Sequence, residues 1–357
     1  MTPAVLDQLP ALNERHHTMR AVVMYAPGDV RVDQAERPAI VEPTDAVIKL
    51  AATCICGSDL WPYRGADHVD HQPMGHEYVG VVDEVGTAVE NVKVGDFVVG
   101  SFFSSDNTCE ICQAGYQTHC VHRGPGAVPG AQAEYARIPN ADGTLVATPG
   151  MPDADLIPSL LAASDVLGTG WFAAVAAEAG PGKTVAVVGD GAVGLLGVLA
   201  AKQLGAERII AMSRHADRQA LARDFGATDI VEERGDAGVA RIKELTGGLG
   251  AHSTIEAVGT QESMMQAIRS TRAGGHVGYV GVSHEVALPG EELFFSGVHL
   301  HGGPAPVRRF LPELIQLIWD RTIDPGKVFD LALPIEEAAE GYRAMDERRA
   351  TKVLLTF

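Results

Sequence analysis

The first part of the chain alternates short apolar runs with breaks at glycine, proline and aspartate. Between residue 19 and about residue 150, runs such as MRAVVMYA, DAVIKLAAT, YVGVVDEVG and GDFVVGSFF have the alternation or the short apolar blocks typical of strands. We therefore expect a β-rich domain in this region. Residues 1–18 are polar and irregular, and we interpret them as a flexible N-terminal extension.

The pattern changes between about residue 165 and residue 305. Apolar strands such as TVAVVGDG, RIIAMSR and HSTIEAVG alternate with alanine-rich helical stretches such as AVGLLGVLAAKQLGA and ADRQALARDFGA. Strand–helix alternation predicts parallel βαβ units in a doubly wound sheet. After residue 305 we expect two helices, FLPELIQLIWDRT and PIEEAAEGYRAMDE, and a last strand, TKVLLTF.

The most apolar window, residues 184–206, contains a glycine pattern with a chemical meaning. Gly189, Gly191 and Gly194 form G-x-G-x-x-G directly after a predicted strand and at the start of a predicted helix. Such glycines permit a tight turn and a close approach of the backbone to a pyrophosphate, which then faces the helix start at Ala192 and Val193. We expect a dinucleotide-binding loop; the alternatives are a glycine-rich turn without a ligand and a membrane span.

The end of the next predicted strand bears on the choice of cofactor. An acidic residue there would bind the ribose hydroxyls of NAD, but IIAMSRHADR has Ser213 and Arg214 and no acid before Asp217. A hydroxyl and a guanidinium suit a 2′-phosphate, so we expect Ser213, Arg214 and Arg218 to bind NADP(H). In the alternative, Arg214 is a solvated surface residue beside the ribose of NAD(H).

Length and charge narrow the class of partner. The chain has 357 residues, enough for one large domain or two of medium size, and a formal net charge of −18. This charge opposes nucleic acid or an anionic membrane as a partner, and we expect a small-molecule substrate. The N-terminus has no basic patch followed by an apolar run, so we expect a cytoplasmic protein whose five cysteines stay reduced.

Three of the five cysteines lie in DNTCEICQAGYQTHC with the spacing C-x2-C-x7-C. Clustered reduced cysteines are typical metal ligands, so Cys109, Cys112 and Cys120 predict a metal site that needs a fourth ligand. Two more residues of zinc-ligand type occur earlier, Cys56 in CICGSDLW and His76 in MGHEYVG. Taken alone, Cys56 is equally a core thiol, and His76 is equally a buried histidine with hydrogen-bond partners.

Taken together, these motifs point to a family. GHEYVGVVDEVG, CICGSD, VGD before the cysteine-rich loop, and the GDGAVG turn stand in one order along the chain. From about residue 20 to Phe357 the chain resembles the zinc-dependent alcohol dehydrogenases of the medium-chain dehydrogenase/reductase family. The resemblance implies an α/β fold of two domains. These are a GroES-like β-rich catalytic domain at 19–166 and 306–357, with a zinc lobe at about 102–124, and a Rossmann doubly wound parallel-sheet cofactor domain at 167–305.

The resemblance also implies an activity. We expect a zinc-dependent, NADP(H)-linked alcohol dehydrogenase or carbonyl reductase that transfers hydride reversibly between a nicotinamide and an alcohol, ketone or aldehyde. The alternatives are a zinc-free quinone or enone reductase, an NAD-linked polyol or aldehyde dehydrogenase, and a nucleotide-binding protein without activity. Relatives form tetramers or dimers, so we expect a homotetramer or homodimer, with the strand-like segment at about 292–303 as a candidate subunit contact.

The resemblance assigns a catalytic zinc to Cys56, His76 and a third residue. Many relatives use a cysteine at the third position, but this chain has no cysteine after Cys120, and the matching residue is Asp165. A carboxylate is an acceptable zinc ligand. In the alternative, Asp165 caps the helix that follows it.

The resemblance assigns a structural zinc to the cysteine-rich loop. The family has four cysteines there, and Asp106 stands at the first of the four positions. We therefore expect Asp106, Cys109, Cys112 and Cys120 to hold a structural zinc. The alternatives are a degenerate lobe with no metal, or a fourth ligand supplied by His119 or His122, which flank Cys120.

Four positions near the catalytic zinc ligands also match the family. Asp59 matches a carboxylate that orients the ligating histidine, and Glu77 matches one that transiently approaches the metal. Ser58 matches the hydroxyl that hands the substrate proton outward. The family's proton relay ends in a histidine where this chain has Trp61, which leaves the proton path open and narrows the expected substrate pocket.

The remaining matches lie further from the metal. Thr169 matches a residue packed beside the nicotinamide ring, and Lys352 matches a basic residue that reaches the pyrophosphate. In the alternative, Lys352 is a surface lysine on the last strand. Phe102 matches a wall of the substrate pocket, and Phe294 or Phe295 are further candidates for its lining, although aromatic residues are more often plain core.

Overall fold

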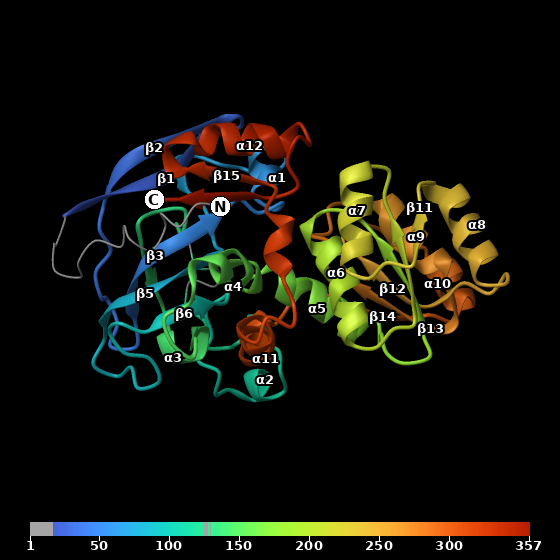
Figure 1. Cartoon of the computed structure of the whole chain (residues 1–357), viewed down its shortest axis with the longest axis horizontal. Coiled ribbons are helices and arrows are strands. Elements are labelled where there is room, and N and C mark those ends of the chain that lie inside the picture. Colours follow the sequence, from blue (N-terminus) through green and yellow to red (C-terminus); the bar gives the residue numbers. More distant parts are fainter. Residues whose placement is uncertain (1–16, 125–127, 129) are drawn as a thin grey trace. The chain divides into compact units, whose positions relative to one another are not determined.

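The computed structural model describes residues 17–124, 128 and 130–357 (Figure 1). The predicted N-terminal extension therefore lies outside the described residues except at its end, where Thr18 begins the first strand. The chain divides into two compact units. One comprises the residues up to Asp165 together with Pro306–Phe357, and the other comprises Val166–Ala305.

The first unit is rich in strands, as the sequence pattern predicts. Its larger sheet has the order β15-β16-β3-β5-β6-β8, with β7 paired to β3. These strands are β3 (Ala46–Cys54), β5 (Tyr78–Val85), β6 (Phe97–Gly100), β7 (Tyr135–Ile138), β8 (Leu145–Ala147), β15 (Leu331–Pro334) and β16 (Val353–Thr356). A smaller antiparallel sheet has the order β2-β1-β4 and consists of β1 (Thr18–Ala26), β2 (Asp29–Glu36) and β4 (Gln72–Pro73).

Two larger hydrophobic cores and a smaller one around Met19, Ala21 and Ala133 stabilise the described part of this unit. One lies around Ile48, Tyr78 and Val98 of the larger sheet. The other is closed by helix α12 (Ala338–Asp346), which buries Tyr342 against strands of both sheets. The short helices of the unit are α1 (Leu60–Tyr63), α2 (Glu110–Gln113), η2 (Gln117–His119), α3 (Ala141–Thr144), η3 (Ala154–Leu156), η4 (Pro325–Val328) and η5 (Ile335–Glu337), and the longer ones are α4 (Ile157–Ala163) and α11 (Val307–Trp319).

The second unit is the doubly wound parallel sheet that the strand–helix alternation predicts. Its six strands are parallel and have the order β11-β10-β9-β12-β13-β14, so the direction in which successive strands are added to the sheet reverses between β9 and β12. The strands are β9 (Thr184–Val188), β10 (Arg208–Met212), β11 (Asp229–Val231), β12 (Ala251–Glu256), β13 (Thr271–Tyr279) and β14 (His299–Gly302). The helices are α5 (Val166–Ala176), α6 (Ala192–Gln203), α7 (Ala216–Asp224), α8 (Gly235–Leu245), α9 (Gln261–Ser270) and α10 (Gly290–Ser296).

The segment at 292–303 is not a single strand. Its first part belongs to α10, which ends at Gly297 with φ of 62°, and only its second part forms β14 at the edge of the sheet. A glycine in the left-handed region is a common helix stop. Phe294 and Phe295 therefore lie on a surface helix, 79% and 76% exposed, and do not line an enclosed pocket.

The most apolar window, residues 184–206, forms β9, a turn and α6, which agrees with the strand-turn-helix interpretation. Within the described ranges, no single helix is long and apolar enough to cross a membrane. Only two consecutive helical segments taken together, Ala154–Ala163 and Val166–Ala176, reach the length and apolar composition of a membrane span, and the chain bends by 48° between them.

Candidate metal centres and cofactor loop

The first cluster of candidate ligands lies where β3 ends and β5 begins. Thr53 near the end of β3 pairs with Tyr78 at the start of β5. Cys56, two residues beyond β3, and His76, two residues before β5, therefore emerge at the same end of the sheet. Asp165 reaches this cluster from the residues that follow α4.

The donor atoms of this cluster lie close together. Asp165 Oδ2 is 3.8 Å from Cys56 Sγ and 3.3 Å from His76 Nε2. With Glu77 included, one ligand atom from each of the four residues lies within 4.8 Å of the others. A sulfur, an imidazole nitrogen and carboxylate oxygens are the donors that zinc prefers in proteins, so the set fits a zinc ion.

The electrostatics of the cluster favour a cation. Burial opposes protonation of His76, but Cys56, Asp165 and Asp59 raise its pKa well above the usual value. Burial, together with Glu77 and Asp165, raises the pKa of the Cys56 thiol. Negative groups are therefore concentrated at a site that is mostly buried, and a positive charge at their centre stabilises them.

A chain of hydrogen bonds centred on Asp59 supports Cys56 and His76. Asp59 Oδ1 lies 3.6 Å from His76 Nδ1, as expected for the carboxylate that orients the histidine. Asp59 Oδ2 accepts from Cys56 N at 2.9 Å and from Gln132 Nε2 at 3.1 Å. The hydroxyl of Tyr342 donates to Gln132 Oε1 at 3.0 Å. Gln132 and Tyr342 were not predicted from the sequence, because no recognisable motif spacing links either residue to the candidate ligands.

Lys352 is not the surface lysine that one sequence-based interpretation gave. Its ammonium is 1% exposed and donates to Glu77 Oε1 at 2.7 Å and to Ile55 O at 3.2 Å. A contact of Lys352 with the pyrophosphate stays a prediction. Burial opposes the charged form, yet Cys54 and Glu77 hold the pKa of Lys352 well above its usual value. The reason is the location of β16, which runs beside β3 inside the sheet and points Lys352 at the metal cluster's second carboxylate.

Three more residues with expected roles lie around this cluster. Ser58 is half-buried between Cys56 and the start of α1. Trp61 is half-buried within α1. The ring of Phe102 lies 6.1 Å from the ring of His76, edge to face. Phe102 therefore borders His76.

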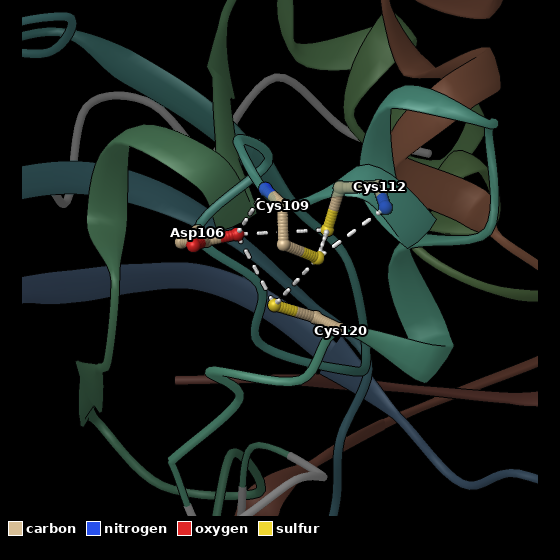
Figure 2. A group of neighbouring side chains, drawn as sticks. All are labelled: Asp106, Cys109, Cys112 and Cys120. Carbon is tan, nitrogen blue, oxygen red and sulfur yellow. Dashed lines mark hydrogen bonds between the residues drawn. The ribbon is translucent and has the colours of Figure 1, made fainter.

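The cysteine-rich loop gathers a second cluster, drawn in Figure 2. Asp106 Oδ1 is 3.2 Å from Cys120 Sγ and 3.6 Å from Cys112 Sγ. Cys109 Sγ is 3.4 Å from Cys112 Sγ and 4.0 Å from Cys120 Sγ, and no disulfide joins these described cysteines. The loop produces this arrangement because Cys109 caps the short helix α2, which carries Cys112 on its next turn. One carboxylate and three thiols are a suitable donor set for structural zinc.

Hydrogen bonds in the second cluster lower the pKa values of Asp106 and Cys109, which favours the negatively charged forms that a cation would bind. Backbone N–H groups of Val121 and Cys112 lower the pKa of the Cys109 thiol to about 7. Despite partial burial, hydrogen bonds from Thr108 and His122 hold the pKa of Asp106 far below its usual value. His122 Nδ1 lies 2.6 Å from Asp106 Oδ2, so this histidine contacts the candidate ligand rather than the centre of the cluster.

The glycine loop has the conformation that a dinucleotide-binding turn requires. Gly189 has φ of 116°, a value that other residues rarely adopt. A Cβ atom on Gly194 would lie 2.0 Å from Gly189 O, so only glycine permits this approach of α6 to the turn. Gly191 caps α6, whose first residues Ala192 and Val193 are half-buried at the helix start.

The residues expected to choose the cofactor surround Asp190, which lies inside the glycine loop. Ser213 Oγ donates to Asp190 Oδ2 at 2.7 Å, and Arg218 lies 3.4 Å from Asp190 Oδ1. Arg214 is exposed. Sequence analysis missed Arg234, whose guanidinium lies 3.9 Å from Asp190 Oδ2 and whose buried Nε has no hydrogen-bond partner among the described residues. Its distance along the chain from the glycine motif left no sequence signal.

Thr169, expected beside the nicotinamide ring, lies in α5 of the second unit. It is buried. Its surroundings within α5 are closely packed, because Gly170 next to it meets the backbone of α6.

Comparison with known proteins gives a consistent result. Residues 42–150 match the alcohol dehydrogenase GroES-like domain, and residues 192–320 match the zinc-binding dehydrogenase domain. A zinc-type alcohol dehydrogenase B of Aspergillus flavus is 34% identical over 349 residues, covering 94% of this chain and 81% of that protein. An NADP-dependent isopropanol dehydrogenase of Thermoanaerobacter brockii is 33% identical over 326 residues, covering 87% and 91%. The solved structure of an alcohol dehydrogenase from a Thermus species has a TM-score of 0.84 and 31% identity, covering 95% and 99%.

Proposed function

The chain belongs to the zinc-type alcohol dehydrogenases of the medium-chain dehydrogenase/reductase family and is an oxidoreductase, and from this premise we propose that it is an NADP(H)-linked alcohol dehydrogenase or carbonyl reductase. The reaction is reversible hydride transfer between the nicotinamide and a small alcohol, ketone or aldehyde. The observation that carries the proposal is the convergence of Cys56, His76 and Asp165 within 4.8 Å of one another.

These three residues are the proposed ligands of a catalytic zinc. Three protein ligands and one open position are typical of catalytic zinc sites, whereas structural sites use four. A zinc ion bound here supplies a Lewis acid to the oxygen of the alcohol or carbonyl. Asp59 keeps the Nδ1 side of His76 engaged, so that Nε2 points toward Asp165. The Ser58 hydroxyl is the proposed first relay of the alcohol proton: Oγ accepts that proton while the hydroxyl releases its own proton outward toward solvent.

The second cluster is the proposed structural zinc site. Asp106 supplies the ligand that completes the three cysteines, and the donor chemistry and short distances support this assignment. A metal bound there stabilises the lobe and takes no part in the chemistry. The free thiols that such a site needs are kept in a reducing compartment, which supports a cytoplasmic location.

The preference for NADP(H) rests on positive charge near the end of β10. Arg218 and Arg234 both approach Asp190, and Arg214 adds an exposed guanidinium beside Ser213. Guanidinium groups that surround a ribose site suit a 2′-phosphate. One observation favours the NAD-linked alternative, because Asp190 itself offers a carboxylate that accepts ribose hydroxyls.

The proposed assembly is a homodimer or homotetramer. β14 is an edge strand of the six-stranded sheet and pairs, within the described residues, only with β13. An edge strand presents unpaired N–H and C=O groups to another chain. A second copy of β14 is the proposed partner.

The experiment that tests the function combines metal analysis with kinetics. About two zinc ions per chain are expected on the purified protein, one for each cluster. Initial rates on a panel of alcohols, ketones, quinones and enones are then measured with NADPH and with NADH. Cys56→Ser is expected to lose one zinc and the turnover of alcohols, while Cys54→Ser, a buried thiol outside the cluster, keeps both.

Two outcomes contradict the proposal in different ways. A zinc-free protein that reduces quinones or enones replaces the dehydrogenase mechanism with the zinc-free alternative. A clear preference for NADH keeps the zinc chemistry but removes the assignment of NADP(H).

A further inference from the structure

Asp190 of the glycine loop lies at one edge of the six-stranded sheet, among side chains from three neighbouring strands. It follows β9 by two residues, and Ser213 directly follows β10, which pairs in register with β9. Arg218 lies in α7, after β10, and Arg234 lies between β11 and α8. The carboxyl ends of these parallel strands meet at the edge where such folds bind ligands. One acid, one hydroxyl and two guanidinium groups therefore gather there.

The acid of this group contacts the residues that are proposed to bind the cofactor. Asp190 Oδ2 accepts the Ser213 hydroxyl at 2.7 Å, and Asp190 Oδ1 lies 3.4 Å from a terminal nitrogen of Arg218. A terminal nitrogen of Arg234 lies 3.9 Å from Asp190 Oδ2, beyond hydrogen-bond length. No other carboxylate of the described residues forms an ion pair with Arg218 or Arg234. The Asp190 carboxylate is thus the counterion that both arginines share.

A ligand can reach these charged groups. The side chains of Asp190, Arg218 and Arg234 are 13%, 15% and 27% exposed. A Cβ atom on Gly191, the residue after Asp190, would meet no atom within 4 Å, so the loop is open beside the carboxylate. An anion that approaches the two arginines therefore also approaches Asp190.

We propose that Asp190 is a specificity-determining residue that disfavours the 2′-phosphate of NADP(H) and favours the free 2′-hydroxyl of NAD(H). The proposal rests on the proposed function, because it concerns the same cofactor site. A ribose 2′-hydroxyl donates a hydrogen bond to a carboxylate, as it does to the acid at the end of the second strand in NAD-binding folds. A 2′-phosphate has a second pKa of about 6, so near neutral pH it brings about two negative charges beside the negative Asp190.

Asp190 and the two arginines therefore act in opposite directions. Arg218 and Arg234 attract a phosphate through charge-assisted hydrogen bonds. The phosphate has to replace Asp190 as their counterion, and it is repelled by that carboxylate at close range. The preference for NADP(H) is then smaller than the arginines alone would give. Removal of the Asp190 charge frees both arginines for the phosphate and removes the repulsion.

The test uses two nucleotides that differ only in the 2′-phosphate, adenosine 5′-monophosphate and adenosine 2′,5′-bisphosphate. Their dissociation constants are measured by calorimetry on the full-length, zinc-loaded protein at equal ionic strength, so the readout needs no turnover. Asp190→Asn is expected to bind the bisphosphate about tenfold or more tightly than the unmodified protein, because a like charge is removed. It is expected to bind the monophosphate about fivefold more weakly, because an amide oxygen is a weaker acceptor than a carboxylate.

Glu244→Gln is the matched control. The Glu244 side chain is 70% exposed near the far end of α8, so the variant has the same change in net charge away from Asp190. It should bind both nucleotides like the unmodified protein. Asp190→Ser is a second test with a smaller acceptor and should shift both dissociation constants in the same directions as Asp190→Asn. The melting temperature of every variant shows whether the second unit is folded.

Opposite shifts for the two nucleotides support the proposal, and three other results overturn it. If both nucleotides bind more weakly to Asp190→Asn and Asp190→Ser, Asp190 shapes the loop and selects neither cofactor. If only the bisphosphate binds more weakly, Asp190 holds the arginines in place for the phosphate, which reverses the proposed role. Unchanged binding of both nucleotides shows that Asp190 does not meet the ribose.

Failure of the proposed function gives a different result. If the unmodified protein prefers the monophosphate, NADP(H) is no longer the favoured cofactor, yet opposite shifts in Asp190→Asn still assign the selective role to Asp190. If the protein lacks catalytic zinc or turns over no alcohol, the dehydrogenase activity is excluded, while the two dissociation constants still decide the role of Asp190.

Discussion

Lys352 Nζ lies 2.7 Å from Glu77 Oε1, and neither side chain is exposed by more than 1%. Glu77 follows His76 directly, and its second oxygen, Oε2, is buried without a partner among the described residues. The last strand of the chain thus supplies the only positive charge in the described residues that contacts this carboxylate. This pair decides how much negative charge the metal cluster carries.

Replacement of Lys352 by methionine is expected to destabilise the protein by about 3–5 kcal/mol, because it leaves Glu77 buried without a counterion. The measurement is the free energy of unfolding in denaturant. In the double variant Lys352→Met/Glu77→Gln, most of this loss should be recovered. If Lys352→Met instead weakens NADPH binding at unchanged stability, a contact of Lys352 with the pyrophosphate is supported.

Asp106→Asn is expected to lose the structural zinc, because an amide oxygen is a weaker zinc ligand than a carboxylate. Elemental analysis should fall by about one zinc per chain, while turnover per remaining catalytic zinc changes little. Asp236→Asn, an exposed aspartate in the second unit, is the control and should keep both metals. Full zinc content in Asp106→Asn would mean that another residue is the fourth ligand.

Arg234→Gln is expected to raise the KM for NADPH by about tenfold or more and to leave the KM for NADH nearly unchanged, because only NADPH carries the 2′-phosphate. Arg241→Gln in α8, the helix that Arg234 precedes, is the matched control, since Arg241 is half-buried and paired with Glu244. Initial-rate kinetics with both cofactors give the comparison. An equal rise in KM for NADPH and NADH would show that Arg234 stabilises the glycine loop and does not bind the 2′-phosphate.

His252 is expected to make the second unit sensitive to acid. Burial, with Arg272 and Lys183, lowers its pKa below 6.5, and its Nδ1 accepts the N–H of Thr184 at 3.1 Å. The unfolded chain binds the proton more readily, so this contribution is complete above the unfolded pKa and is lost as the pH falls through the folded one. Removing this acceptor costs about 1 kcal/mol.

The measurement is the melting temperature from about pH 8 to about pH 5.5, the range in which histidine titrates. His252→Asn offers an acceptor that does not titrate, so its melting temperature should fall less across this range than that of the unmodified protein. Identical pH profiles for the two proteins would exclude His252 as the source of the sensitivity.

Several features were predictable because a few neighbouring residues encode them. Gly189 and Gly194 specify their turn through local sterics, and Cys109 and Cys112 converge because the short helix α2 spaces them. The alternation of strands and helices likewise predicted the parallel sheet. The segment at 292–303 was misjudged, because apolar residues on a short exposed helix have the composition of a strand.

Residues far apart in the chain were brought together only by the tertiary structure. The sequence by itself determined the two kinds of unit, the cofactor turn and the ligand types of both clusters. The register of β3 with β5 and β16 then decided that Lys352 faces Glu77 rather than solvent. Packing of α12 and of the residues before β7 decided that Tyr342 and Gln132 support Asp59. The pairing of β9 with β10 decided that Asp190 meets Ser213. Such contacts depend on how strands pair and helices pack, and no local spacing records them.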